Sequence, residues 1–243
     1  MVLGVDIGNT NVSFGLMDKN GKISRKCAIP TASSNLKLFS AGVKKRVKKI
    51  IISSVVPSAL ARLKHRLKKN FKGAEIFVVG KNVKVPLKCA YARREIGQDR
   101  LVTAFAAGSF YGLPILIIDF GTAVTFDAVS KKGVYLGGLI LPGIKMSLES
   151  LSERTAMLPK TYLKKTSSFI GRDTASSIRN GMIYGYGAIC EGLISSFRKK
   201  VDKNIKVIAT GGDAPLISRY APSMRRIDLH LSLKGLYLLS ETV

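Results

Sequence analysis

The hydrophobic and polar positions along the chain alternate between the two-residue period of strands and the longer period of amphipathic helices. In the first half, this pattern predicts strands at 1–5, 12–17, 50–56 and 74–80, and helices at 58–71 and from residue 99 onward. In the second half, it predicts strands before 119, after 122, at 134–143 and from 205, and helices at 144–158 and 174–201. Strands that alternate with helices indicate an α/β fold with helices packed on central sheets.

The helix expected at 58–71 has the clearest amphipathic pattern. Its apolar face carries Leu60, Leu63 and Leu67. Basic residues occupy the opposite face, as is typical of a helix with one side in solvent. Ser58 follows the strand-ending Pro57 and is the expected N-cap.

Two stretches, one in each half, repeat the same arrangement. VLGVDIGNTNVSFGLMDKNGK and ILIIDFGTAVTFDAVSKKGVY both run from an apolar strand through Asp-x-Gly to an alternating strand and a Lys/Gly turn. Asp6 lies 15 residues before Gly21, and Asp119 lies 14 residues before Gly133. A repeat with so long a period indicates two related subdomains rather than a solenoid.

We therefore expect two domains that meet near residue 110, at 1–110 and 111–243. Each would begin with a β-hairpin, whose neighbouring strands are antiparallel. Because later strands return through helices, the sheets are expected to be mixed, with helices flanking them.

The turn after the first strand, DIGNTN, has two interpretations. An acid at the end of a buried strand can hold Mg²⁺, and a glycine turn can aim backbone N–H groups at phosphate oxygens. Alternatively, Asn and Gly simply form a hairpin turn. The matching turn at Asp119, with Thr122 beside it, favours the first interpretation, because facing subdomains would bring both acids to one phosphate-binding cleft.

The segment EIGQDR places Asp99 and Arg100 between a glycine turn and a helix. An Asp at this position is often only a helix cap. It could also accept a proton from an alcohol, while the arginine binds a carboxylate through a two-pronged contact.

Three glycine-rich segments are open to a structural or a ligand-binding interpretation. TGGDAP, residues 210–215, could place backbone against a ring or phosphate, or could be a helix-entry turn. GGLILPG, residues 137–143, could admit a ligand or close-pack a turn. Gly181 and Gly185 share a helix face, which predicts a close approach by another helix, within the chain or across a dimer.

The charge is strongly basic, with 40 Lys+Arg against 15 Asp+Glu and a net charge of +25. Such a surface attracts polyanions but does not determine the fold. Recognisable nucleic-acid-binding motifs are absent, so we do not expect nucleic acid as a partner. The apolar runs fall short of a membrane span. The three scattered cysteines form no disulfide framework, which favours a cytoplasmic location.

Taken in order, the motifs resemble those of type III pantothenate kinases. The matching segments are DIGNTN, SSVVP, IGQDR, DFGTAVTFD, GGLILPG, TAMLP, the Thr174 region, TGG and LSLKGL. They extend over nearly the whole chain. The chain departs from the family pattern at ARRE after Tyr91, at Gln98 and at Asp213.

The resemblance implies the actin-like ATPase fold, with two ribonuclease-H-like domains and ATP in the cleft between them. It also implies ATP-dependent phosphorylation of the terminal hydroxyl of pantothenate, the first step of coenzyme A biosynthesis. The family is dimeric and uses Mg²⁺ and a monovalent cation, K⁺ or NH₄⁺.

Individual roles are likewise implied by the resemblance. The residues implied for ATP are Asp6, Ile7, Gly8, Asn9, Thr10, Asn11 and Thr122. Those implied for pantothenate are Tyr91, Gly97, Gln98, Asp99, Arg100 and Thr174. Asp99 would be the proton acceptor, Arg100 would bind the substrate carboxylate, Asp6 would hold Mg²⁺ with the phosphates, and Asp119 would bind the monovalent cation.

Two other functions remain open. A catalytically inactive relative could act as a nucleic-acid-binding regulator, which the net charge of +25 would suit. The same fold could also serve another small-molecule kinase or a polyphosphate phosphatase.

Overall fold

The computed structural model describes residues 1–33 and 41–243, which form two compact units by their contacts. The first unit contains Met1–Lys88, Ala92–Ser109 and His230–Val243, and the second contains Cys89–Tyr91 and Phe110–Leu229. The C-terminal segment therefore belongs to the first unit, whereas the sequence placed it in the second domain. The physical reason is that its helix packs on three strands of the first sheet.

In the first unit, a five-stranded mixed sheet has the order β3-β2-β1-β4-β5. The strands are β1 Val2–Ile7, β2 Asn11–Met17, β3 Ile23–Pro30, β4 Lys49–Ser54 and β5 Glu75–Val78. β1 pairs antiparallel with β2 and parallel with β4, and β4 pairs parallel with β5. The predicted hairpin therefore lies beside a parallel crossover.

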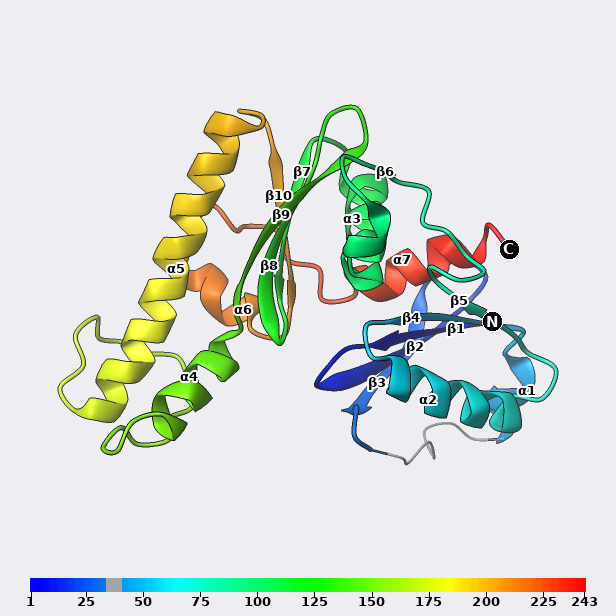
Figure 1. Cartoon of the computed structure of the whole chain (residues 1–243), viewed down its shortest axis with the longest axis horizontal. Coiled ribbons are helices and arrows are strands. Elements are labelled where there is room, and N and C mark those ends of the chain that lie inside the picture. Colours follow the sequence, from blue (N-terminus) through cyan, green and yellow to red (C-terminus); the bar gives the residue numbers. More distant parts are fainter. Residues whose placement is uncertain (34–40) are drawn as a thin grey trace. The chain divides into compact units, whose positions relative to one another are not determined.

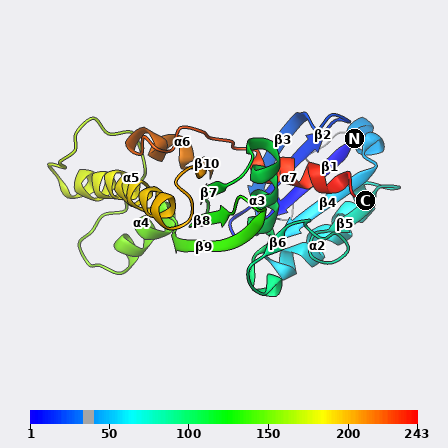
Figure 2. The ribbon, with the colours of Figure 1, turned by 90° about the horizontal axis from the view of Figure 1, so that it is seen from above.

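Helices cover both faces of this sheet (Figures 1 and 2). The helical elements of the unit are α1 Ala41–Arg46, α2 Pro57–Asn70, the 3₁₀ turn η1 Arg93–Glu95, α3 Gln98–Tyr111 and α7 Leu231–Ser240. α2 buries Leu63 and Leu67 in the core, with Leu60 partly buried beside them, as the pattern predicted. On the opposite face, α7 approaches closely because Gly4 and Gly15 leave room for Leu233.

The start of α2 differs from the prediction. Its N-cap is Val56, which makes no side-chain cap, and Pro57 occupies the first turn. Ser58 is therefore already inside the helix. Proline suits this position because its fixed φ matches the helix and its missing N–H would have had no intrahelical partner.

The second unit contains another five-stranded mixed sheet, in the order β10-β7-β8-β9-β6. Its strands are β6 Lys88–Cys89, β7 Ile115–Phe120, β8 Ala123–Val129, β9 Val134–Pro142 and β10 Lys206–Gly211. The helical elements are α4 Ile144–Glu153, α5 Thr174–Lys200, α6 Ala214–Ile217 and η2 Ser218–Tyr220. α4, α5 and α6 lie on one face of the sheet, where Cys190 and Ile194 of α5 join the core (Figures 1 and 2).

Two helices of this unit show what determines their ends. α5 begins at Thr174 because Asp173 and Ser176 form a reciprocal capping box. α4 ends at Glu153, five residues before the predicted end at Leu158. The reason is packing: Met157 is 90% exposed, so no apolar face sustains the helix to that point.

The two sheets repeat each other, residue by residue, around the duplicated turns. In both β1 and β7 every residue is buried except the half-buried acid at the fifth position, Asp6 or Asp119. Each acid has a hydroxyl residue opposite it on the parallel neighbour, Ser53 for Asp6 and Thr210 for Asp119. The predicted α/β fold with duplicated halves and mixed sheets is confirmed. Among the described residues, no helix is long and apolar enough to cross a bilayer.

Candidate active site

The first site element is Asp6, at the end of β1. Side chains alternate along a strand, so Asp6 shares the face of Gly4, which α7 covers. The Asp6 carboxylate is hydrogen-bonded to Ser232 of α7. Burial, followed by the negative charge of Asp99, raises the pKa of Asp6 to about 6.

The second element is Asp99, in the first turn of α3. Its Oδ1 accepts a hydrogen bond from the Arg100 backbone N–H at 2.8 Å, and its carbonyl accepts one from the Thr103 hydroxyl at 2.6 Å. A Cβ at Gly97 would lie 2.5 Å from Asp99 Oδ1. Glycine at 97 therefore leaves the space in which this carboxylate lies.

The negative charges of Asp6 and Asp99 therefore repel each other within the first unit. Two like charges at close range oppose each other's ionisation, and a bound cation would remove that cost. The buried Ser53 hydroxyl, next to Asp6 in register, makes no hydrogen bond among the described residues. A buried hydroxyl without a hydrogen bond beside the Asp6 carboxylate fits a site for a hydrated Mg²⁺, which keeps several waters and takes only one or two carboxylates.

This arrangement is no all-protein metal cage. The described part of the chain has no group of three or more His, Cys, Asp or Glu side chains able to hold a metal ion. A magnesium ion that arrives with a nucleotide does not need one, because phosphate oxygens and water supply its other ligands.

The turn from Gly8 to Asn11 is held in shape by backbone bonds and by Thr31. Gly8 N–H donates to the Asn11 carbonyl at 3.0 Å, and the Thr31 hydroxyl donates to the Gly8 carbonyl at 2.7 Å. Thr31 N–H also donates to the Thr10 carbonyl at 2.9 Å. The side chains of Asn9, Thr10 and Asn11 are exposed. The turn is therefore a fixed loop with polar side chains in solvent, as a phosphate-binding loop requires.

The equivalent turn in the second unit is one residue tighter. Gly121 N–H donates to the Ala123 carbonyl at 3.0 Å, and Thr122 is exposed. A Cβ at Gly143 would collide with the Thr122 backbone, and one at Gly138 would collide with the Phe126 carbonyl. Gly143 therefore packs closely against the backbone of the Asp119 turn, and Gly138 packs against that of β8.

The two glycines of the TGG segment fit different interpretations, one structural and one ligand-binding. Gly211 has φ +89°, and a Cβ there would collide with the backbone of Phe120, so its role is structural. Gly212 is exposed, and a Cβ there would meet nothing within 4 Å, so this position is open to a ligand. Burial raises the pKa of the neighbouring Asp213, and Lys145 opposes that rise.

The implied pantothenate residues fall in both units. Gly97, Gln98, Asp99 and Arg100 lie in the first unit and are half-buried. The Gln98 side chain packs on Gly80, whose φ of +81° favours glycine.

Tyr91 and Thr174 lie in the second unit, at separate places in it. Tyr91 is 39% exposed, with its ring against Gly137 of β9 and its centroid 6.3 Å from that of Tyr135. Thr174 is the exposed first residue of α5.

Three supporting residues were not singled out from the sequence. Ser53 and Ser232 lie in the recognised segments SSVVP and LSLKGL, so those motifs were the available signal. The sequence gives no such signal for Thr31, because this residue follows β3 in a stretch without any motif. Only the fold brings Thr31 under the Gly8 turn.

The fold defines the class first. Two mixed sheets that each begin with the same hairpin form a duplicated α/β fold, which solved structures of other proteins share. A solved structure of a protein assigned as a 2-dehydro-3-deoxygalactonokinase from Sinorhizobium meliloti is similar, with a TM-score of 0.58 at 14% identity over 100% of this chain and 97% of that one. A conserved protein assigned to the Baf family of transcriptional activators from Campylobacter jejuni has a TM-score of 0.62 at 20% identity, over 99% and 98%.

The sequence then defines the family. The family profile described as type III pantothenate kinase matches residues 2–196. The type III pantothenate kinase of Persephonella marina is 40% identical over 98% of this chain and 97% of that protein. The chain belongs to the type III pantothenate kinase family, whose members are ATP-dependent kinases of coenzyme A biosynthesis.

Proposed function

We propose that this chain transfers the terminal phosphoryl group of ATP to the terminal hydroxyl of pantothenate, with Asp99 as the proton acceptor. Family membership supplies the substrates. The observation that supports the chemistry is the electrostatic coupling of Asp99 with Asp6 in the first unit, which suits a site where one carboxylate holds a metal ion and the other accepts a proton. Phosphoryl transfer requires mostly positioning and charge neutralisation, and this pair can contribute to both.

In this proposal Asp6 holds Mg²⁺ together with ATP phosphates. When bound, the ion supplies positive charge that neutralises the phosphate oxygens. The chain's own contribution is the Gly8–Asn11 turn, fixed by Thr31, which presents polar groups to the phosphates. Thr122, exposed in the equivalent turn of the second unit, is proposed as a further ATP contact.

Proton transfer would rest with Asp99. The Arg100 N–H bond fixes the orientation of the carboxylate. The Asp99 carboxylate is proposed to accept the proton of the pantothenate hydroxyl, and a general base of this kind accounts for about 10²–10⁴-fold in rate.

Recognition of pantothenate is proposed to use the remaining residues of this group. Arg100 would bind the carboxylate through its guanidinium fork. Gly97 and Gln98 would contact the substrate from the same turn, and Tyr91 and Thr174 would add contacts from the second unit.

Asp119 is proposed to bind the monovalent cation, K⁺ or NH₄⁺. It occupies in β7 the place that Asp6 has in β1, next to Thr210 on β10. Oxygen ligands of this kind suit hard cations.

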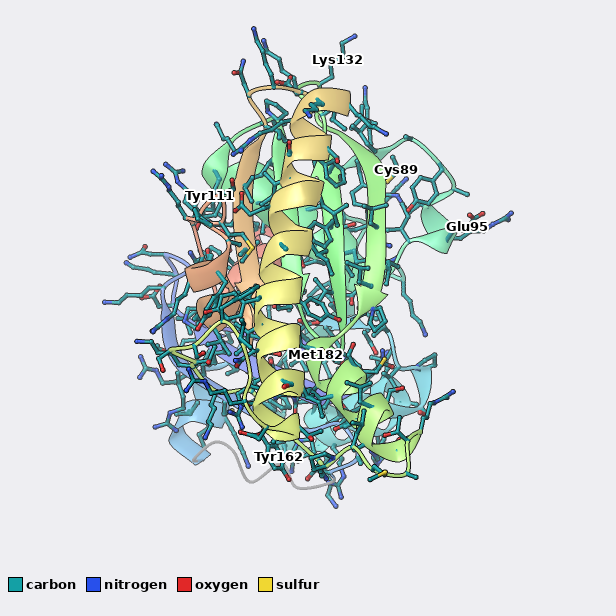
Figure 3. All side chains as sticks on the ribbon, turned by 90° about the vertical axis from the view of Figure 1, so that its left-hand side faces the viewer. Cys89, Glu95, Tyr111, Lys132, Tyr162 and Met182 are labelled. Atoms are coloured by element: carbon teal, nitrogen blue, oxygen red, sulfur yellow. The ribbon has the colours of Figure 1, made fainter. Side chains whose placement is uncertain are left out.

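The homodimer is also a proposal, supported by the surface of α5. Gly181, Gly185 and Gly192 lie on one helix face, and a Cβ at each would meet nothing within 4 Å. Ala188 and Ile189 on the same face are exposed. In Figure 3, α5 with Met182 lies in front of the sheet, toward the viewer. The close approach predicted for these glycines is not made within the described residues of the chain, which leaves a second copy of α5 as the expected partner.

The location is proposed to be the cytoplasm. Coenzyme A biosynthesis takes place there, and the three free cysteines suit a reducing compartment.

A coupled ADP-release assay tests the proposed function. We expect turnover that requires pantothenate, Mg²⁺ and either K⁺ or NH₄⁺. Turnover of another alcohol in place of pantothenate would contradict the substrate assignment, and full turnover in Na⁺ alone would contradict the role given to Asp119.

The regulator alternative is favoured by one observation, the net charge of +25. DNA or RNA binding with a steep salt dependence, together with no ADP release, would replace the kinase proposal with the regulator.

A further inference from the structure

The second unit has a pocket of about 690 Å³ beside the start of strands β7 and β10. Ile115 and Lys206, which pair at that end of the two strands, both line it. The Asp119–Thr210 pair lies four residues further along, about 13 Å at the usual rise of a strand. The pocket is therefore at the opposite end of these strands from the proposed cation site.

Basic side chains dominate the lining of this pocket. They are Arg198, Lys203, Lys206, Arg225 and Arg226. Among the described residues that line it, none is acidic. All five basic residues are exposed, so each can reach a ligand from solvent.

Three of these cations are tethered by the pocket wall. Lys206 Nζ donates to the Tyr111 carbonyl at 2.8 Å. Arg198 Nη1 donates to Ser223 Oγ at 3.4 Å, and Arg225 Nε donates to the Pro222 carbonyl at 3.4 Å. Such bonds reduce the side-chain entropy that would be lost on binding a ligand.

Three acids lie beside lining residues, and each accepts a hydrogen bond. Asp202, which precedes Lys203 in the chain, accepts one from the Asn204 N–H at 2.8 Å. Glu191 accepts from Ser223 N–H at 2.7 Å and from the Ser223 hydroxyl at 2.8 Å, so it orients the residue that holds Arg198. Asp228 accepts from the Tyr111 hydroxyl at 2.8 Å, which fixes the aromatic wall. None of the three acids is part of the lining, and two of them hold the lining residues Ser223 and Tyr111 in place.

We propose that this pocket, defined by the five basic residues and Tyr111, binds a small ligand that carries a chain of phosphate groups. Arginine forks and lysine ammonium groups bind phosphate oxygens directly. Five cations around one pocket match several phosphates rather than one carboxylate. The volume falls within the range of small-molecule sites. A single aromatic wall, instead of a row of stacking platforms, favours a compact ligand over single-stranded nucleic acid.

Calorimetric titration with inorganic tripolyphosphate, without Mg²⁺, tests the pocket in the full chain. The test variant is Arg225→Gln/Arg226→Gln. The control is Lys164→Gln/Lys165→Gln, which removes the same charge from exposed positions just after Tyr162, at the opposite end of α5 from Arg198 (Figure 3). We expect the test variant to weaken one binding step about tenfold or more, the equivalent of about 1.4 kcal/mol, and the control to change it less than twofold.

Equal weakening in both variants would overturn the proposal, because it would show only a general charge effect. Unchanged binding in the test variant would also overturn it. Pantothenate kinase turnover should stay within about twofold in both variants, because neither pair belongs to the proposed catalytic machinery. Failure of the pocket can therefore be told apart from failure of the proposed function.

Two further ligands identify the source of the phosphate chain. If the test variant weakens the binding of ATP without Mg²⁺ more than the binding of tripolyphosphate, the pocket binds a nucleotide. If it weakens both equally, the pocket recognises the phosphates alone. Both results agree with the proposal. A 12-nucleotide single-stranded RNA that binds tighter than tripolyphosphate and loses affinity in the same variant would contradict it in favour of nucleic acid.

Discussion

At the scale of single residues, the site holds acids in places that cost stability. Asp6 lies at the end of a buried strand. Burial and then the charge of Asp99 raise its pKa to about 6. In the unfolded chain the same carboxyl has an ordinary pKa of 3.8. The folded apo protein therefore holds a proton more tightly than the unfolded chain between about pH 4 and pH 6.

The first prediction concerns this cost. Because folded Asp6 has the higher pKa, its contribution to stability falls as the pH rises from about 4 to about 6 and stays low above that. Asp6→Asn should therefore raise the free energy of unfolding by about 1–3 kcal/mol at pH 7.5 and by little at pH 4. Urea unfolding at both pH values, without nucleotide or metal, measures this change in the free energy of unfolding. The same gain at both pH values would contradict the linkage.

The second prediction concerns Gly97. A methyl group there would lie against Asp99 Oδ1 and displace the carboxylate. Gly97→Ala should lower kcat by about 10–100-fold, part of what loss of a general base costs, while the affinity for ATP changes little. The matched control is Gly42→Ala, where a Cβ meets nothing within 4 Å. An unchanged kcat in Gly97→Ala would mean that the position of this carboxylate does not matter for turnover.

At the scale of elements, periodicity predicted most strands and helices, because each buries one apolar face. The duplicated hairpins were predictable in detail, since β1 and β7 repeat the same spacing of apolar residues and acid. The start of α2 and the end of α4 were not. The start of α2 depends on Pro57, which occupies the first turn of the helix. The end of α4 depends on whether Met157 has an apolar surface to pack against, and that is decided by the tertiary fold.

The third prediction tests the packing of α7. Gly235 lies against Val102 of α3, where a Cβ would come within 2.6 Å of the Val102 carbonyl. Gly235→Val should lower the free energy of unfolding by about 1–3 kcal/mol through overpacking. Gly42→Ala in α1, where a Cβ meets nothing within 4 Å, is the control, because it should be neutral or stabilising by up to about 1 kcal/mol. Equal effects of the two changes on urea unfolding would show that α7 does not pack as described.

At the scale of the whole molecule, the family was predicted from the order of several short motifs, and no single motif would have been enough. The family, the fold class and the kinase activity could be predicted because acids at strand ends and glycine turns are local patterns. The return of His230–Val243 to the first unit could not, because LSLKGL is an apolar helix that would suit either sheet. The basic pocket was equally hidden, since its five cations come from α5, β10 and the segments near them.

The fourth prediction concerns assembly. Gly185→Arg would place a long charged side chain on the open glycine face of α5, and we expect it to convert a dimer into a monomer in light scattering. Asn20→Arg, which adds the same charge at an exposed turn of the first unit, is the control and should remain dimeric. A monomeric parent chain, or a Gly185→Arg variant that stays dimeric, would show that this face is not the interface.

The most direct test of the central claim is the turnover of Asp99→Asn in the ADP-release assay with pantothenate, Mg²⁺ and K⁺. The substitution keeps the size of the side chain and removes the proton acceptor. We expect kcat to fall by about 10²–10⁴-fold, with ATP affinity retained, while Glu75→Gln at the exposed start of β5 keeps full activity. Unchanged turnover in Asp99→Asn would contradict the assignment of Asp99 as the base.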